Sequence, residues 1–131
     1  MTFNWPHFLT ISRLLNNYAD STAKKPEIKE AAYRSAVGRA YYSAFGYSFE
    51  YAENFMGFHG TRLGEDHKGL REWYKNKNHP KIKRKLLDLW KMRRACDYDM
   101  FVNDPEIKAQ SSIQLALDLI KEIDQLPRIK P

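Results

Sequence analysis

The sequence predicts an all-α protein, an up-and-down bundle of about five helices. Prolines recur where helical patterns of apolar residues begin, and the polar–apolar alternation of β-strands is nearly absent. The stretches between these patterns are mostly short, which favours antiparallel neighbours in a bundle. A chain of 131 residues suggests a single helical domain, residues 1–131, large enough to bury a normal core.

The first helix is expected to begin in the segment NWPH, with Asn4 or Trp5 as its cap. Pro6 then falls in the first turn, where the missing N–H of proline costs nothing. Residues 20–26, DSTAKKP, predict the loop that follows this helix. The expected apolar stripe of the first helix consists of Phe8, Ile11, Leu15 and Tyr18.

The second helix is expected from Pro26 to about Phe55, a stretch that has two glycines and no further proline. Small residues alternate with aromatic ones on one side of it, which predicts a central core helix with closely packed neighbours. The residues of this stripe are Ala32, Ala36, Val37, Ala40, Tyr41, Ala44, Ser48, Tyr51 and Phe55.

Three shorter segments complete the expected bundle. Glycine-rich residues 57–65 predict a loop, and Asp66 is the expected cap of a short third helix over residues 66–77. A fourth helix is expected from about residue 81 to residue 98. Asp104 is the expected cap of the fifth helix, which ends before Pro127 and whose predicted core face is Ile113, Ala116, Leu117, Ile120 and Ile123.

The composition excludes several classes of protein. Apolar residues make up 43% and charged residues 29%, as in folded globular proteins. The single Cys96 excludes an intrachain disulfide framework and a cysteine-based zinc site. No apolar run approaches the roughly 18 residues of a membrane span, and the N-terminus lacks the pattern of a signal peptide. We therefore expect a cytoplasmic protein with no membrane association.

The positive charge is concentrated in one part of the chain. Residues 62–94 contain twelve Lys and Arg against four Asp and Glu, a formal charge of +8, whereas the rest of the chain sums to −2. A concentrated basic surface favours an anionic partner, with nucleic acid as the first candidate. The alternative is a solvated face that only keeps the protein soluble.

Common cofactor and metal motifs are missing from the chain. We find no glycine-rich phosphate loop before a helix, no His-Glu-x-x-His and no nucleophile elbow. The four histidines, at positions 7, 59, 67 and 79, are scattered along the chain. We therefore expect neither a cofactor nor a metal ion.

The fourth helix carries charge where its pattern calls for apolar residues. Its apolar stripe of Ile82, Leu86, Leu89 and Trp90 continues onto Arg93 and Asp97. A charge on a core stripe is costly unless it is paired and hydrogen-bonded. One interpretation is a local Arg93–Asp97 ion pair near the end of the helix, with or without a contact to Tyr98. The other is that the stripe faces a polar cleft or a symmetry-related copy, where the guanidinium fork meets phosphate oxygens.

The segments SAVGRAYYSAFGYSFEYAE, DHKGL and MRRACDYD, followed by an amphipathic last helix, resemble the HEPN family, the higher eukaryotes and prokaryotes nucleotide-binding domain. The resemblance covers roughly residues 5–125 and is similar to the small prokaryotic branch of the family. It implies a helical bundle, usually a two-fold homodimer. It also implies a role in toxin–antitoxin or defence systems, often beside a nucleotidyltransferase-type antitoxin partner.

Many HEPN proteins are metal-independent ribonucleases, and the resemblance implies candidate catalytic residues. The family motif places Arg, then a polar residue, then His after a few further residues; Arg steadies the phosphate and His handles protons. Arg93 stands at the motif arginine and Arg94 at the polar position. Tyr98 occupies the place of the histidine. With an unperturbed pKa near 10, only about one Tyr in a thousand is a phenolate at pH 7.

Other residues could supply the missing proton acceptor or bind phosphate. Asp97 could act as a base if burial raised its pKa, although the neighbouring Arg93 would lower that pKa. His67 could supply an imidazole from the third helix, but an exposed or helix-capping role is the expectation for it. Arg39, in GRAYY, is a further candidate for phosphate binding, or an ion-pair partner at the edge of the core.

Three functions therefore stay open from the sequence. The first is a HEPN-type ribonuclease that cleaves RNA without a metal ion. The second is a non-catalytic HEPN module that binds a nucleotide, RNA or a partner protein, and the replacement of the motif His favours it. The third is a helical scaffold in which Arg93 and Asp97 form only a local pair.

Overall fold

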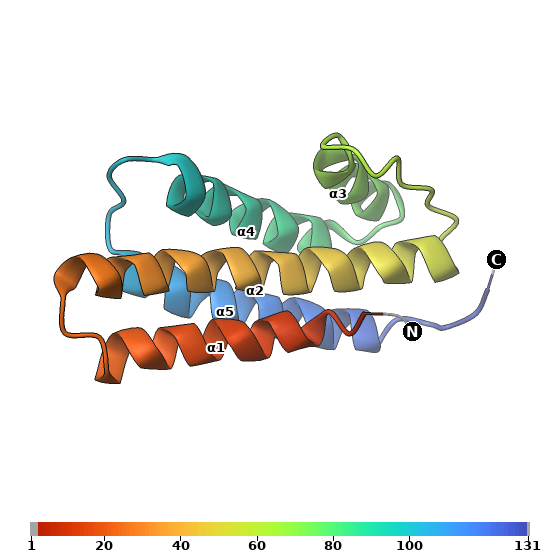
Figure 1. The fold of residues 1–131 in the computed structure, drawn as a ribbon. Helices are drawn as coiled ribbons and strands as arrows, with labels where there is room; N and C mark the ends of the chain where they lie inside the picture. The colour runs from red at the N-terminus through yellow and green to blue at the C-terminus, as the bar shows by residue number, and fades with distance from the viewer. Residues whose placement is uncertain (1–2, 131) are drawn as a thin grey trace.

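The structure of the protein is a computed structural model that describes residues 3–130. These residues form five helices and no strand, which confirms the predicted all-α bundle (Figure 1). The helices are α1 (Pro6–Ser21), α2 (Pro26–Phe55), α3 (Asp66–Asn76), α4 (Pro80–Tyr98) and α5 (Pro105–Asp124). All except α3 have proline as their first residue, as the sequence predicts.

The longest helix, α2, forms the centre of the bundle. Its 30 residues correspond to a length of about 45 Å. Figure 1 shows α1 and α5 on one side of α2 and α4 and α3 on the other, and every other helix contacts it. The four long helices run in alternating directions, so the end of α4 returns to the first half of α2.

The apolar face predicted for α2 is in the core. Every residue of the predicted stripe is buried except Phe55, which is half-buried. The small residues let the neighbouring backbones come close, and the aromatic rings fill the space beside them. The predicted face of α5 also lies in the core, with Ala116, Ile120 and Ile123 buried and Ile113 and Leu117 half-buried.

The face predicted for α1 is wrong in part. Ile11 and Tyr18 are 44% and 43% exposed, whereas Leu9, Ser12 and Ala19 are buried. The Ser12 hydroxyl donates a hydrogen bond to the carbonyl of Ala36 in α2, at 2.5 Å. This contact brings the backbones of α1 and α2 close together. Small residues of α1, Ser12 and Ala19, therefore face α2, and the larger Ile11 and Tyr18 are exposed to solvent. The helix also extends to Ser21, into the predicted loop.

Of the two predicted aspartate caps, Asp104 occupies the N-cap position of α5, whereas the N-cap residue of α3 is Glu65. Asp66 is the first residue of α3, and its carboxylate accepts hydrogen bonds from Thr61 N at 2.8 Å and Arg62 N at 2.7 Å. It therefore fastens the preceding loop, residues 57–65, because that loop folds back over the start of α3. Asp104 stands at the N-cap position of α5, but its side chain makes no capping hydrogen bond.

The C-terminal end of α4 is tied to α2 by Arg34. This guanidinium donates hydrogen bonds to the carbonyl of Asp99 at 2.8 Å and, more weakly, to that of Cys96 at 3.4 Å. Carbonyls at a helix end lack partners within the helix, so Arg34 satisfies them. The contact fixes the last turn of α4, which carries Arg93, Asp97 and Tyr98, against the first half of α2.

Candidate nucleic-acid interface

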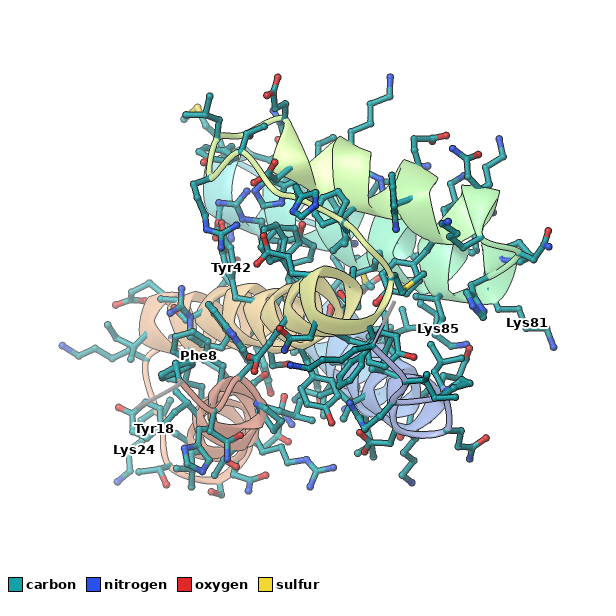
Figure 2. The ribbon with its side chains drawn as sticks, turned by 90° about the vertical axis from the view of Figure 1, so that its right-hand side faces the viewer. Phe8, Tyr18, Lys24, Tyr42, Lys81 and Lys85 are labelled. Atoms are coloured by element: carbon teal, nitrogen blue, oxygen red, sulfur yellow. The ribbon has the colours of Figure 1, made fainter. Side chains whose placement is uncertain are left out.

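Four arginines and four aromatic rings alternate across the face formed by α1, α2, α3 and α4. Each guanidinium lies over the rings beside it, with 4.8 to 5.8 Å between its central carbon and a ring centroid. Figure 2 shows Phe8 of α1 and Tyr42 of α2 on the same side of the molecule. We call this array the arginine–aromatic ladder; in order it comprises Phe8, Arg39, Tyr42, Arg93, Tyr98, Arg94, Trp90 and Arg71.

The first part of the ladder joins α1 and α4 across α2. The Arg39 guanidinium lies 4.9 Å from the Phe8 ring and 5.8 Å from the Tyr42 ring. The opposite neighbour of Tyr42 is Arg93, at 5.3 Å. Arg39 pairs with no carboxylate among the described residues, so it is not the core-edge ion pair that the sequence left open.

Arg93 forms the local ion pair with Asp97 that one of the two interpretations predicted. Its Nε lies 2.8 Å from Asp97 Oδ2, and its side chain is 15% exposed. The contact is an ion pair without a hydrogen bond, because the N–H does not point at the oxygen. The same guanidinium lies 5.4 Å from the Tyr98 ring. Arg93 is therefore held by a local acid and at the same time faces the other groups of the ladder.

The last part of the ladder runs along α4 and ends on α3. Arg94 lies between Trp90 at 5.2 Å and Tyr98 at 5.6 Å, two rings placed four residues on either side of it. Tyr98 is 65% exposed and Arg94 is also exposed, so this part is open to solvent. Arg71 of α3 lies 4.8 Å from the Trp90 ring and is buried.

Arg71 is the member of the ladder whose burial costs the most free energy. Only 8% of the residue is exposed, and its buried Nη1 has no hydrogen-bond partner. Burial lowers the pKa of this guanidinium from its ordinary value. A buried donor without a partner costs about 1–3 kcal/mol. A ligand with a hydrogen-bond acceptor could supply the missing partner of Nη1, which makes Arg71 a candidate ligand-binding group.

The ladder carries more positive than negative charge. Asp97 is the partner of Arg93, whereas Arg39, Arg71 and Arg94 pair with no carboxylate of residues 3–130. A guanidinium on an aromatic face keeps its N–H fork free in the plane of the group for a phosphate. The array therefore offers both phosphate-binding forks and flat aromatic surfaces.

His67 lies beside the ladder, so the exposed or capping role expected for it is wrong. Its ring is half-buried, stacks on Phe45 at 4.5 Å and lies 6.3 Å from Tyr42. Nδ1 shares a hydrogen bond with the Tyr41 hydroxyl. Burial, followed by the charges of Arg93 and Arg71, lowers the pKa of His67 below its usual value. Its imidazole is consequently neutral at pH 7 and able to accept a proton.

All six residues singled out in the sequence come together at this face. Arg39, Arg93, Arg94 and Tyr98 are members of the ladder, and Asp97 and His67 contact or adjoin it. The sequence reasoning missed Phe8, Tyr42, Trp90 and Arg71 as site residues. The spacing of Trp90, Arg94 and Tyr98 at steps of four was a usable signal, because such residues stack along one helix face.

Three further observations concern metal ligands, membrane spans and similarity to known proteins. In residues 3–130, no three His, Cys, Asp or Glu side chains gather in a way that could hold a metal ion. No helix in that part of the chain is long and apolar enough to cross a bilayer. Comparison with models of protein families, with curated proteins and with solved structures found no match to this chain.

Proposed function

We propose that this chain is a HEPN-type, RNA-directed protein that holds single-stranded RNA on the arginine–aromatic ladder. The observation that carries the proposal is the unbroken alternation of guanidinium groups and aromatic rings over four helices. Guanidinium forks bind phosphate oxygens, and aromatic rings stack on bases. The family resemblance of the sequence supports the same class of ligand.

The aromatic rings of the ladder favour single-stranded RNA over a duplex. Bases in a helix are stacked and cannot reach an aromatic side chain, whereas the bases of loops and ends are free to do so. Tyr98 and Arg94, at the exposed part of the ladder, are accessible to such a base and its phosphate. Stacking on an aromatic ring contributes about 1–3 kcal/mol per base.

A second candidate function is metal-independent cleavage of the bound RNA, and the position of His67 favours it. In the tautomer whose Nδ1–H donates to the Tyr41 oxygen, Nε2 is free to take a proton from a 2′-hydroxyl. The 2′-oxygen then bonds to the adjacent phosphorus, whose non-bridging oxygens accept hydrogen bonds from Arg93, and the P–O5′ bond breaks. The 5′-oxygen takes a proton from the Tyr98 hydroxyl. The products are a 2′,3′-cyclic phosphate and a 5′-hydroxyl.

The homodimer and the antitoxin partner remain predictions from the family resemblance. A two-fold dimer would bring two ladders together, and a nucleotidyltransferase-type partner would regulate the assembly. Exposed apolar side chains on α1 and after α4 are available for such contacts; they include Leu14, Tyr18, Met100 and Phe101.

The proposed function is tested by binding and cleavage of labelled single-stranded RNA in the presence of a chelator. Arg93→Gln is expected to weaken binding about 10-fold or more, because a hydrogen bond to a charged group contributes about 1.5–3 kcal/mol. It should also reduce the dependence of log affinity on log salt by about 0.7, the value for one phosphate contact on a single strand. The matched control is Lys81→Gln, which removes the same charge from the exposed start of α4.

Equal losses of affinity for Arg93→Gln and Lys81→Gln, with both variants folded by circular dichroism, would overturn the binding proposal. Cleavage is scored separately, by the appearance of 2′,3′-cyclic phosphate ends that disappear in His67→Asn. If wild-type protein binds RNA and yields no such ends, binding stands and the cleavage mechanism is rejected.

A further inference from the structure

A pocket of about 640 Å³ lies beside the ladder. It is bordered by the second half of α2, the 57–65 loop and the start of α1. Its walls include three aromatic rings, those of Trp5, Phe45 and Phe49, together with the side chain of Glu50. Its size is within the usual range for sites of small molecules, about 300–1,000 Å³.

Two rings of this pocket, those of Trp5 and Phe49, pack against the backbone of glycine residues. A Cβ atom added to Gly46 would overlap the Trp5 indole, and one added to Gly60 would overlap the Phe49 ring. The glycines therefore let both rings lie directly against the chain. Because backbone does not repack, the aromatic walls are held in place before any ligand enters.

Most of the charged groups around the pocket already have partners. Arg62 binds Glu53 with two hydrogen bonds, of 2.8 and 2.9 Å, and lies 4.8 Å over the Phe49 ring. Asp66 accepts the amide hydrogens of the 57–65 loop. Glu50, half-buried in the wall, has no hydrogen bond or ion pair with any side chain of residues 3–130. One carboxylate is thus left to receive donors from a ligand that stacks on the rings.

His67 lies between the pocket and the ladder. His67 lines the pocket together with Phe45, on which it stacks, and His67 also lies beside Tyr42 of the ladder. A nucleotide with its phosphate at Arg93 would therefore have its base close to the pocket.

We propose that this pocket binds a guanine base, an inference that rests on the proposed function and names the base it selects. The Watson–Crick edge of guanine carries two adjacent donors, N1–H and the N2 amino group, which match the two oxygens of the Glu50 carboxylate. Adenine, cytosine and uracil each place an acceptor beside their single donor group on that edge, so an oxygen of the carboxylate would face a lone pair. The rings of Trp5 and Phe45 supply the stacking surface.

The test uses nucleosides, which lack phosphate and therefore report on the pocket without the ladder. Guanosine, adenosine, cytidine and uridine are titrated into the full chain and followed by calorimetry. Guanosine is expected to bind about 10-fold tighter than the other three, the discrimination typical of a bidentate contact to a base. Glu50→Gln should remove this preference and strengthen adenosine binding, because an amide accepts from the adenine amino group and donates to the adjacent ring nitrogen. Glu27→Gln, an exposed glutamate at the start of the same helix, is the matched control and should change nothing.

The outcomes separate this inference from the proposed function. Equal binding of the four nucleosides, or a guanosine preference that survives Glu50→Gln, would overturn the guanine pocket even if RNA binding depends on Arg93. A guanosine preference lost in Glu50→Gln, in a protein that does not bind RNA, would support the pocket and reject the RNA function. A guanosine preference together with Arg93-dependent RNA binding supports both.

Discussion

The two ends of α4 are both basic, but they hold their charges in different ways. At the start of the helix, Lys81 is exposed, Arg84 pairs with Asp88 at 3.6 Å, and Lys85 pairs with Glu122 of α5. At the other end, the guanidinium groups lie over aromatic rings. Figure 2 shows Lys81 and Lys85 on the side of the molecule opposite to Tyr42.

Charge density along the chain therefore does not distinguish the two ends of α4. The segment of +8 charge spans both ends of α4, yet only the second end faces the ladder. A lysine in water is a strongly hydrated point charge, and many surface ion pairs contribute almost nothing to stability. An arginine fixed on a ring has lost part of its water and keeps its fork in one orientation. The second end therefore holds its guanidinium groups in fixed orientations, as the proposed RNA site requires.

The largest effect is expected from changes that keep the charge and remove the fork. Replacing Arg39, Arg71, Arg93 and Arg94 together by lysine should weaken single-stranded RNA binding about 100-fold, since each site loses roughly 0.5–1 kcal/mol of stacking and its bidentate geometry. Replacing Lys81, Lys83 and Lys85 together by arginine should change affinity less than about 2-fold. Fluorescence anisotropy with labelled RNA measures both. Similar affinities for the two variants would show that charge alone governs binding.

A smaller effect is expected when the acid of each intrahelical pair on α4 is neutralised. Asp97→Asn should lower the free energy of unfolding by about 1 kcal/mol, because its partner Arg93 is largely covered, whereas Asp88→Asn should cost less than about 0.5 kcal/mol. Chemical denaturation of the two variants gives the comparison. Asp97→Asn should also tighten RNA binding, since it frees the guanidinium for phosphate. A loss from Asp88→Asn as large as that from Asp97→Asn would contradict the contrast between the two ends.

The smallest effect concerns the pKa of His67. Burial and then Arg93 lower this pKa, so an NMR titration of the imidazole should give a midpoint below about 6.5. Arg93→Gln should raise it part of the way back, and Lys81→Gln should leave it unchanged. Because the folded protein holds the neutral imidazole, its contribution to stability is present above about pH 6.5 and is lost as the pH falls from there through the folded pKa. A midpoint at or above 6.5 in the wild type would contradict the placement of His67 beside the ladder.

Much of the fold follows from local signals in the sequence. Prolines mark the starts of α1, α2, α4 and α5 because their missing N–H suits a first turn. The face of α2 could be predicted because its small and aromatic residues leave only one way to pack. The face of α1 could not, since its orientation depends on the contact of Ser12 with a residue 24 positions away.

The candidate site was predictable from a broken pattern at Arg93 and Asp97, and from the family resemblance at Arg39, Arg94 and Tyr98. Arg93 and Asp97 stood out because they interrupt an apolar stripe, and each proved to be partly covered. Arg71 did not stand out, because one more arginine in a basic segment has no distinguishing context. The position of His67 depends on its contacts with Tyr41 and Phe45, which lie 26 and 22 residues earlier. Such long-range contacts are set by helix packing and leave no local trace.

The indole of Trp5 lies against α2 at Gly46, so a substitution at residue 46 would affect side chains far from it in the sequence. A methyl group introduced at residue 46 would overlap the indole and displace it, and the neighbouring rings of Phe3 and Phe8 would move with it. A mutational scan would then score residue 46 among the buried positions of the central helix, although the damage would arise at the beginning of the polypeptide. The absence of a side chain beyond hydrogen at residue 46 thus couples the position of Trp5 to the shape of the pocket that both residues line.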